Sequence, residues 1–188
     1  GSVCESALKI GNLSYTAFTP ADVDYGERAI LNWTGVENAT SCTLNGGQFS
    51  NVNVGTAMNG STTTIPLYTD TTYTLTCQGF GESVAKQVVV PVASGAIDAT
   101  PLVCIIPTGQ STCTTDVTWT TFNMSSPRVT NASDVTLSIS PTGDGVQFPA
   151  YYGNNTFALK NATVTHDSIV VNAACDPSAI WSGVMCVA

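Results

Sequence analysis

Among the residue types that could do chemistry in this chain, cysteine has the most informative number and spacing. The 188 residues contain seven cysteines, and no two of them form a CxxC pair. Zinc sites and thioredoxin-type redox sites are commonly built on such close pairs, whereas the structural disulfides of exported proteins do not need them. The spacing therefore predicts disulfides, an oxidising compartment and an extracellular or cell-surface location.

One disulfide is predicted between two strands. Cys42 lies in TSCTL (40–44) and Cys77 lies in YTLTC (73–77), and both segments alternate apolar and polar residues as half-buried strands do. A bond between these cysteines would close a loop of about 36 residues, which is worth ~4 kcal/mol in the chain-entropy model. We expect this bond to join the two strands covalently.

Two shorter loops predict the other disulfides. Cys104 and Cys113 flank a turn that contains proline and glycine, and Cys175 and Cys186 flank a ten-residue segment. Cys4 is left over. The chain ends GSVCES and SGVMCVA share a Ser/Gly, Val, Cys frame, so Cys4 could be the second cysteine of a preceding repeat; alternatively, the first two residues come from cloning and Cys4 is unpaired.

Other residue types that could do chemistry are sparse. His166 lies beside Asp167, but no nucleophile is positioned against it by any recognisable motif, and on an alternating strand we expect it to be exposed. Asp22, Asp24 and Glu27 could attract calcium, yet the residues that follow supply no further oxygen ligands, which favours an ordinary loop. The sequence therefore predicts no catalytic residue, no metal site and no cofactor.

Aromatic residues and glycosylation motifs remain as candidates for surface function. Tyr151 and Tyr152 adjoin the turn Gly-Asn-Asn, and with Trp181 they are candidate contacts for a glycan or a protein. Many Asn-X-Ser/Thr sequons can arise by chance in a chain this rich in these residues, and they matter only if the source organism glycosylates them. The eight sequons begin at Asn12, Asn32, Asn38, Asn59, Asn123, Asn131, Asn154 and Asn161.

The composition excludes two classes of partner. Charged residues make up 10% of the chain, the net charge is −8, and the five Lys and Arg residues are scattered singly. A nucleic-acid binder needs a clustered basic surface, so nucleic acid is not an expected partner. No apolar run approaches the ~18 residues that a membrane-spanning helix requires, so we expect no membrane insertion.

The elements that must position these residues are short strands. In each half of the chain, segments with a period of two are separated by turn signals at intervals typical of a β-sandwich, and no segment shows a convincing helical period. Segment 93–100 is small and polar and is expected to be a linker. We therefore predict an all-β chain of two tandem immunoglobulin-like sandwiches stapled by disulfides, over residues 1–97 and 98–188.

The second half repeats the opening of the first. Residues 23–34 and 106–120 both run from an apolar residue through a turn glycine to a strand that ends in Trp-Thr. Trp33 and Trp119 are then equivalent, and at inward positions of alternating strands each is expected to pack into its own core.

These segments resemble a known family. LNWTGVENATSCTLNGG, TTYTLTCQG, CIIPTGQSTCTTDVTWTT and CDPSAIWSGVMC are similar to tandem immunoglobulin-like repeats of large secreted or surface proteins, which are common in uncultivated small-genome bacteria. The resemblance implies an immunoglobulin-like fold, export, and a role in a stalk, filament or adhesive surface. It supplies no catalytic residues.

Two functions are consistent with this reading. The first is a non-enzymatic structural or adhesive repeat module that associates head to tail, with residues 1–19 as a candidate arm that docks on the strand edge of a neighbour. The second is an adhesin module that binds a surface glycan or a host protein through loops at one end of a sandwich.

Overall fold

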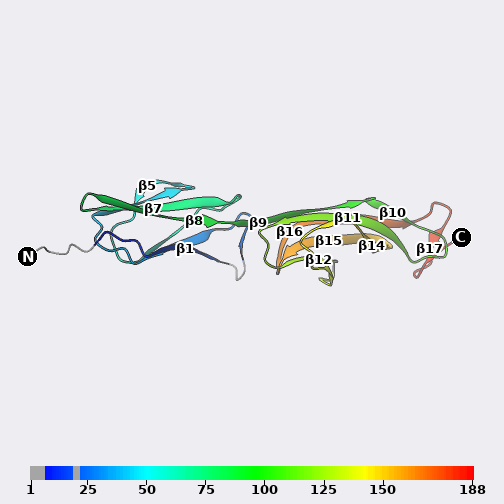
Figure 1. Ribbon diagram of the computed structural model, residues 1–188. Helices are drawn as coiled ribbons and strands as arrows, with labels where there is room; N and C mark the ends of the chain where they lie inside the picture. The colour runs from blue at the N-terminus through cyan, green and yellow to red at the C-terminus, as the bar shows by residue number, and fades with distance from the viewer. Residues whose placement is uncertain (1–6, 19–21) are drawn as a thin grey trace, which may run out of the picture. The chain divides into compact units, whose positions relative to one another are not determined.

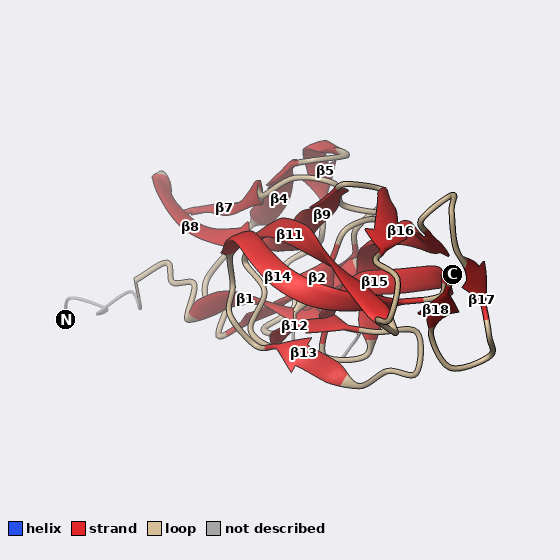
Figure 2. Cartoon of the chain, turned by 90° about the vertical axis from the view of Figure 1, so that its right-hand side faces the viewer, coloured by secondary structure: helices blue, strands red, loops and turns tan. Residues whose placement is uncertain are grey.

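The computed structural model describes residues 7–18 and 22–188, which form strands and loops only (Figure 1). Figure 2 shows no helix among the coloured residues, as the absence of a helical period predicts. The chain divides into two compact units, Gly1–Val92 and Ala93–Ala188. The described residues are therefore all-β, with a separate hydrophobic core in each unit and three disulfides.

The first unit has two sheets. One sheet has the order β1-β3-β6, and the other has the order β5-β4-β7-β8. All strand pairs described within these two sheets are antiparallel. The strands of this unit are β1 (Asn12–Ala17), β2 (Val23–Asp24), β3 (Ala29–Thr34), β4 (Ser41–Gly46), β5 (Phe49–Asn53), β6 (Gly60–Thr63), β7 (Thr71–Gly79) and β8 (Glu82–Val90).

Alternation along these strands creates one core between the two sheets. Leu31 of β3 is fully buried in one sheet, and Leu44 of β4 and Leu75 of β7 are fully buried in the other. The alternate residues along each strand are more exposed, and apart from Ile30 they are polar. Inward side chains at every second position are what a half-buried antiparallel sheet requires.

The second unit has two larger sheets and the two-stranded sheet β17-β18. One has the order β10-β16-β15-β12-β13, and the other contains β14, β11 and β9 in that order. Strand β10 is an edge strand in this order, and it runs parallel to its neighbour β16. The strands are β9 (Val92–Thr100), β10 (Val103–Ile106), β11 (Thr112–Phe122), β12 (Pro127–Thr130), β13 (Thr136–Ser138), β14 (Gly143–Tyr151), β15 (Gly153–Asn161), β16 (Val164–Cys175), β17 (Ile180–Trp181) and β18 (Cys186–Val187).

The two predicted core tryptophans are buried, and each lies over a glycine. Trp33 is 5% exposed and its partner across the sheet is Gly60, whereas Trp119 is 2% exposed and its partner is Gly143. A Cβ atom on either glycine would lie 2.4 or 2.3 Å from the indole ring. Both units therefore have the same contact of a tryptophan ring with a glycine. The sequence predicted the buried tryptophans but not the glycines opposite them.

Two expectations about the ends of the first unit were wrong. The expected linker at 93–100 belongs to β9, which pairs with β11 from Ser94 to Thr100. The expected arm is part of its own sandwich as far as it is described, because β1 pairs with β3 and Leu8 and Ile10 are buried in the first core. Small residues misled the first prediction, since Ala93 and Ala99 are buried where larger side chains are usual.

Other local features were not indicated by the sequence. Strands β5 and β12 are stabilised by pairing with β4 and β15 rather than by apolar alternation. The Asp-Gly pair at 144–145 lies within β14, since Gly143 already begins this strand opposite Trp119. At 153–155 the positive φ angle belongs to Gly153 alone, and the two asparagines that follow are extended in β15.

Candidate functional site

The disulfides join the same three pairs that the sequence suggested, but they differ in which strands and sheets they connect. Cys42 and Cys77 are directly opposite on β4 and β7, so this bond lies within one sheet. Cys104 on β10 and Cys113 on β11 belong to different sheets, so this bond ties the two layers of the second unit together. Cys4 lies outside the described residues.

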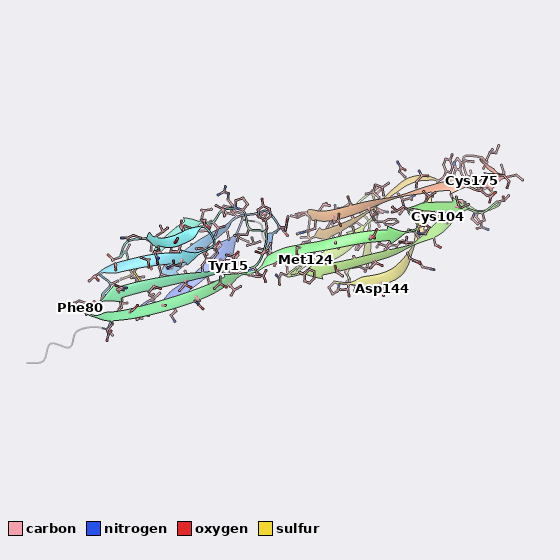
Figure 3. All side chains as sticks on the ribbon, turned by 90° about the horizontal axis from the view of Figure 1, so that it is seen from above. Tyr15, Phe80, Cys104, Met124, Asp144 and Cys175 are labelled. Atoms are coloured by element: carbon pink, nitrogen blue, oxygen red, sulfur yellow. A yellow bond between two sulfur atoms is a disulfide. The ribbon has the colours of Figure 1, made fainter. Side chains whose placement is uncertain are left out.

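The third disulfide lies at the end of β16. Cys175, the last residue of β16, is bonded to Cys186 of β18. Figure 3 labels Cys104 and Cys175 towards the same end of the second unit, which agrees with their neighbouring positions in the parallel β10–β16 pair. Two disulfides therefore reinforce this end, where β17 and β18 form a small hairpin.

A hollow of about 200 Å³ opens on the second unit. It is bounded by the loop between β12 and β13, the end of β14 and the start of β15. Its lining combines apolar side chains with amide and hydroxyl groups, and it includes no charged side chain. These are Asn131, Ala132, Ser133, Leu137, Pro149, Tyr151, Asn154, Asn155, Thr156 and Phe157.

Tyr151 is held in place at the rim of this hollow. The backbone N–H of Tyr151 donates to the Asn155 Oδ1 atom at 2.9 Å, and the Asn155 Nδ2 atom donates to the Tyr151 carbonyl at 2.7 Å. The same Nδ2 atom also reaches the carbonyl of Gly153 at 3.0 Å. The ring of Tyr151 is nevertheless 61% exposed. An exposed aromatic residue on a backbone fixed in this way is preorganised for contact.

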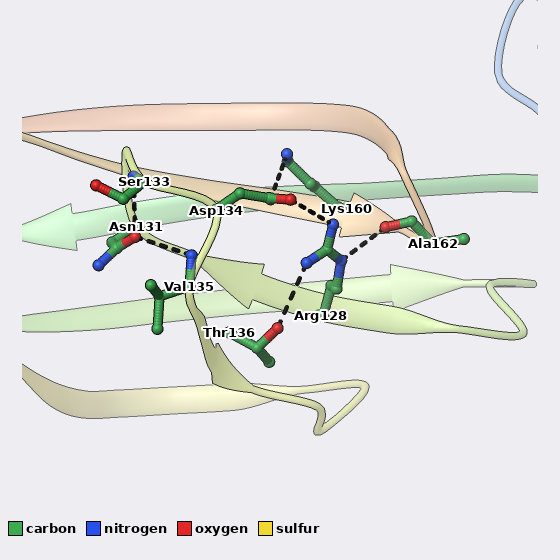
Figure 4. A network of polar contacts seen from close by, with 8 residues as sticks. All are labelled: Arg128, Asn131, Ser133, Asp134, Val135, Thr136, Lys160 and Ala162. Carbon is green, nitrogen blue, oxygen red and sulfur yellow. Dashed lines mark hydrogen bonds and ion pairs between the residues drawn. The ribbon is translucent and has the colours of Figure 1, made fainter.

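The opposite rim is a loop stabilised by one asparagine. The Asn131 Oδ1 atom accepts hydrogen bonds from the backbone N–H groups of Ser133 and Val135, both at 3.0 Å. This is the way in which asparagine side chains commonly stabilise tight turns. Asp134, between them, has a positive φ of 61°. Figure 4 shows how the loop is then tied to the sheet beneath it.

Asp134 connects the loop to the sheet through ion pairs with two basic side chains. The Lys160 Nζ atom lies 2.7 Å from one carboxylate oxygen, and the Arg128 guanidinium lies 3.1 Å from the other. Arg128 also donates to the carbonyl of Ala162 at 2.7 Å, which orients the guanidinium. The hydrogen bonds from Lys160 and Arg128 lower the pKa of the Asp134 carboxyl. The loop is therefore held best when Asp134 is ionised.

The three candidate aromatic contacts are only partly brought together. Tyr152 and Trp181 stack with their ring centroids 4.6 Å apart and their planes 3° from parallel. Tyr151 lines the hollow, and neither of the other two does so. Trp181 is half-buried and packs against the second core, so one face of Tyr152 is covered by a structural neighbour. Tyr151 is therefore the aromatic candidate that adjoins a hollow.

His166 and Asp167 lie within a sheet of the second unit. His166 is half-buried in β16, contrary to the expected exposure, and it lies at a β-bulge, where the register with β15 passes from Asp167 to Thr165. Asp167 accepts hydrogen bonds from the backbone N–H groups of Ile97 at 2.9 Å and of Ser168 at 2.8 Å.

Over residues 7–18 and 22–188, no group of three His, Cys, Asp or Glu side chains could hold a metal ion. No helix in the described part of the chain is long and apolar enough to cross a membrane.

Sequence reasoning missed most of the hollow. Asn131 and Asn154 were noticed only as the first residues of sequons, and Asn155 only as part of a turn. Leu137 and Phe157 read simply as strand residues. The hollow depends on β13, β14 and β15 lying close together, and no local pattern along the chain indicates that proximity.

Comparisons with known proteins give only distant likenesses. No protein-family model matches the sequence, and no curated protein matches it. The chain is similar to the titin fragment A168169, with 13% identity, a TM-score of 0.41, and coverage of 83% of this chain and 94% of that chain. It is also similar to the N-terminal four immunoglobulin domains of Dscam1 isoform 6.44, with 8% identity, a TM-score of 0.42, and coverage of 91% and 47%.

A third likeness is to fibronectin(III)-like modules of Clostridium thermocellum CbhA. The identity is 11%, the TM-score is 0.33, and the coverage is 86% of this chain and 95% of that chain. Likenesses of this size say nothing about function.

Proposed function

We propose that this chain is a non-enzymatic extracellular module that associates with copies of itself in a surface stalk or filament. Each unit has its own hydrophobic core, and both units contain disulfides. Disulfides persist in oxidising surroundings outside the cytosol, which supports an extracellular location. They also limit unfolding of a module that is exposed to proteases and to mechanical load.

Strand β10 is the observation that supports self-association most directly. It is the edge strand of its sheet, and its outward side chains Val103 and Ile105 are 58% and 47% exposed. On the neighbouring strand β16, Val170 is 48% exposed. An exposed apolar edge strand is a surface on which another sheet or an extended segment can add. A second copy of this chain would cover it.

The test is the assembly state of the purified protein. We expect negative-stain electron micrographs to show ordered fibres, and light scattering to show association that rises with protein concentration. The substitutions Val103→Lys and Ile105→Lys should abolish both, because a lysine at an edge strand opposes pairing. Lys86→Ala on β8, the edge strand of a sheet in the first unit, is the matched control. Monomers at every concentration for the wild-type chain would contradict the proposal.

A second candidate function is binding of a surface glycan or a protein at the hollow. The hollow combines an exposed, fixed aromatic ring with amide and hydroxyl groups and an uncharged lining. Such a surface suits a neutral ligand with both hydroxyl groups and apolar faces. Glycan arrays followed by calorimetry would test it. Tyr151→Ala should abolish binding, and Tyr152→Ala should not; no ligand on the array, or equal loss in both variants, would contradict this assignment.

A further inference from the structure

Sequons are more frequent in this chain than its composition accounts for. Ser and Thr make up 45 of the 188 residues, so about 3 of the 13 asparagines would have one of them two positions later if the residues were randomly ordered. Eight asparagines do. An Asn-X-Ser/Thr tripeptide is the acceptor sequence for N-linked glycosylation when X is not proline, and none of the eight has proline there.

Strand alternation explains only part of this excess. In the sheet β1-β3-β6, Asn12 lies opposite Thr34 and Ser14 lies opposite Asn32, so two sequons are in register with their polar residues on the outer face. A strand with one solvent-exposed face favours polar residues at every second position, whether or not any of them is glycosylated. Four other sequons start outside strands, where no alternation operates, at Asn38, Asn59, Asn123 and Asn131.

Exposure separates the eight asparagines into groups. Asn12, Asn38, Asn59, Asn123 and Asn154 are exposed. Asn32 and Asn131 are half-buried, and the Asn32 Nδ2 atom donates to the Thr16 Oγ1 atom at 3.1 Å and to the Ile30 carbonyl at 3.2 Å. Asn161 is 1% exposed, and its Oδ1 atom accepts a hydrogen bond from the backbone N–H of Ser126 at 3.1 Å. A glycan on Asn161 would have no room in this fold.

Two of the exposed sites share a backbone conformation. Asn38 and Asn123 both have positive φ angles, 59° and 54°, in the loops that follow the tryptophan strands β3 and β11. Each unit therefore has an exposed sequon asparagine with positive φ in the loop after its tryptophan strand. The Asn38 Nδ2 atom donates to the Ala7 carbonyl at 3.1 Å, and a glycosylated amide keeps one N–H group, so that bond can remain.

The protein surface gives glycans a physical role. Only 18 of the 188 residues are charged, which is well below the usual share of about 25%. Large apolar side chains stand next to sequons at Met58, which is 58% exposed, and Phe122, which is 64% exposed. Glycans on the neighbouring asparagines 59 and 123 would hydrate and cover these side chains. They would limit unspecific association while leaving β10 free, because no exposed sequon asparagine lies on β10 or β16.

We propose that Asn12, Asn38, Asn59, Asn123 and Asn154 carry N-linked glycans in the native protein; because Asn154 lines the hollow, a glycan there excludes the second candidate function. The donor is a polyprenol-linked sugar phosphate or diphosphate. The bond between the anomeric carbon and the phosphate oxygen breaks, a bond forms between that carbon and the Asn Nδ2 atom, and Nδ2 loses one proton. The polyprenol phosphate or diphosphate leaves. No oxidant or reductant is involved.

The test is glycopeptide mass spectrometry on the chain isolated from its own organism. We expect sugar on the five exposed asparagines and none on Asn161. The control positions are Asn51, Asn53 and Asn172, which are exposed but outside sequons, and they should be unmodified. An intact mass equal to the sequence less six hydrogens for the three disulfides would overturn the proposal, as would sugar on Asn161 from the folded chain.

A second measurement tests whether individual sequons are used, with variants that should fold like the wild-type chain. In a host with an N-glycosylation pathway, Ser61→Ala and Ser125→Ala remove the hydroxyl residue of the sequons at Asn59 and Asn123 and leave both asparagines in place. Both serines are exposed, so neither change should affect folding. Each should remove one glycan from the intact mass. An unchanged glycan number in both variants would show that these sequons are not used.

Discussion

The contact between Trp119 and Gly143 is the most sharply testable feature of the fold. Replacing Gly143 with alanine places a Cβ atom 2.3 Å from the indole ring, where an ordinary contact would be about 3.5–4 Å. The ring cannot easily retreat. It is 2% exposed, its Nε1 atom donates to the Ser140 carbonyl at 3.0 Å, and it stacks on Phe148 with centroids 6.2 Å apart.

The expected destabilisation follows from this lack of room. Overpacking a core typically costs about 1–3 kcal/mol, and we expect about 3 kcal/mol for Gly143→Ala, because the ring must shift by more than 1 Å against a hydrogen bond and a stacked neighbour. For a unit of this size, that cost lowers the midpoint of thermal unfolding by roughly 12–24 °C. Urea denaturation followed by circular dichroism would measure the free energy of unfolding.

Matched variants make the result decisive. Gln147→Ala changes an exposed side chain on the same strand and should alter the free energy of unfolding by less than about 0.5 kcal/mol. Gly60→Ala tests the equivalent contact with Trp33 in the first unit, where the Cβ atom would lie 2.4 Å from the ring. If Gly143→Ala and Gly60→Ala were as stable as the wild-type chain, the ring-on-glycine contact would not constrain either core.

Three further predictions concern the disulfides and the hollow. Replacing Cys42 and Cys77 together with alanine should lower the free energy of unfolding by about 4 kcal/mol, as judged by urea denaturation, because the bond closes the longest disulfide loop. Asp134 should stabilise the chain fully above its unfolded pKa of 3.8 and lose that effect as the pH falls through its lower folded pKa. The melting temperatures of wild type and Asp134→Asn should therefore differ at pH 6 and converge in strong acid. Asn155→Ala should cost about 1–2 kcal/mol and increase amide hydrogen exchange at Tyr151, which loses both backbone bonds to that side chain.

Each of these has a clear contrary outcome. An unchanged denaturation midpoint for the double cysteine variant under oxidising conditions would show that the bond is not formed in solution. A gap between wild type and Asp134→Asn that persists at pH 2 would mean that the carboxylate charge is not what holds the loop. Unchanged exchange at Tyr151 in Asn155→Ala would mean that the side-chain clamp is replaced by other contacts.

Most of the strands could be predicted from local pattern. Segments such as 29–33 and 73–77 alternate so regularly that burial of Leu31, Tyr73 and Leu75 follows from the period of two alone. The failures share one cause. Strands β5, β9 and β12 carry little apolar alternation and exist because a neighbouring strand pairs with them, and that stabilisation depends on residues far away in the sequence.

The candidate site was less predictable than the fold. Tyr151 was singled out correctly as an exposed aromatic residue, yet its neighbours at the hollow come from three separate segments. Trp181 was named as a candidate ligand contact, and in the structure it is half-buried and stacks on Tyr152. Only the packing of the β17–β18 hairpin beside β14 determines which of these rings remains available.

The amino-acid sequence by itself determined that this protein is all-β, that it has two sandwiches, and which cysteines are close enough to pair. Those properties follow from side-chain period, turn residues and loop length, which act over a few neighbouring residues. The tertiary structure alone decided that Cys42–Cys77 lies within a sheet, that Cys104–Cys113 lies between sheets, and that loops and strands enclose a hollow at Tyr151. Sheet order is chosen when all apolar faces are buried together, and that choice is a property of the whole chain.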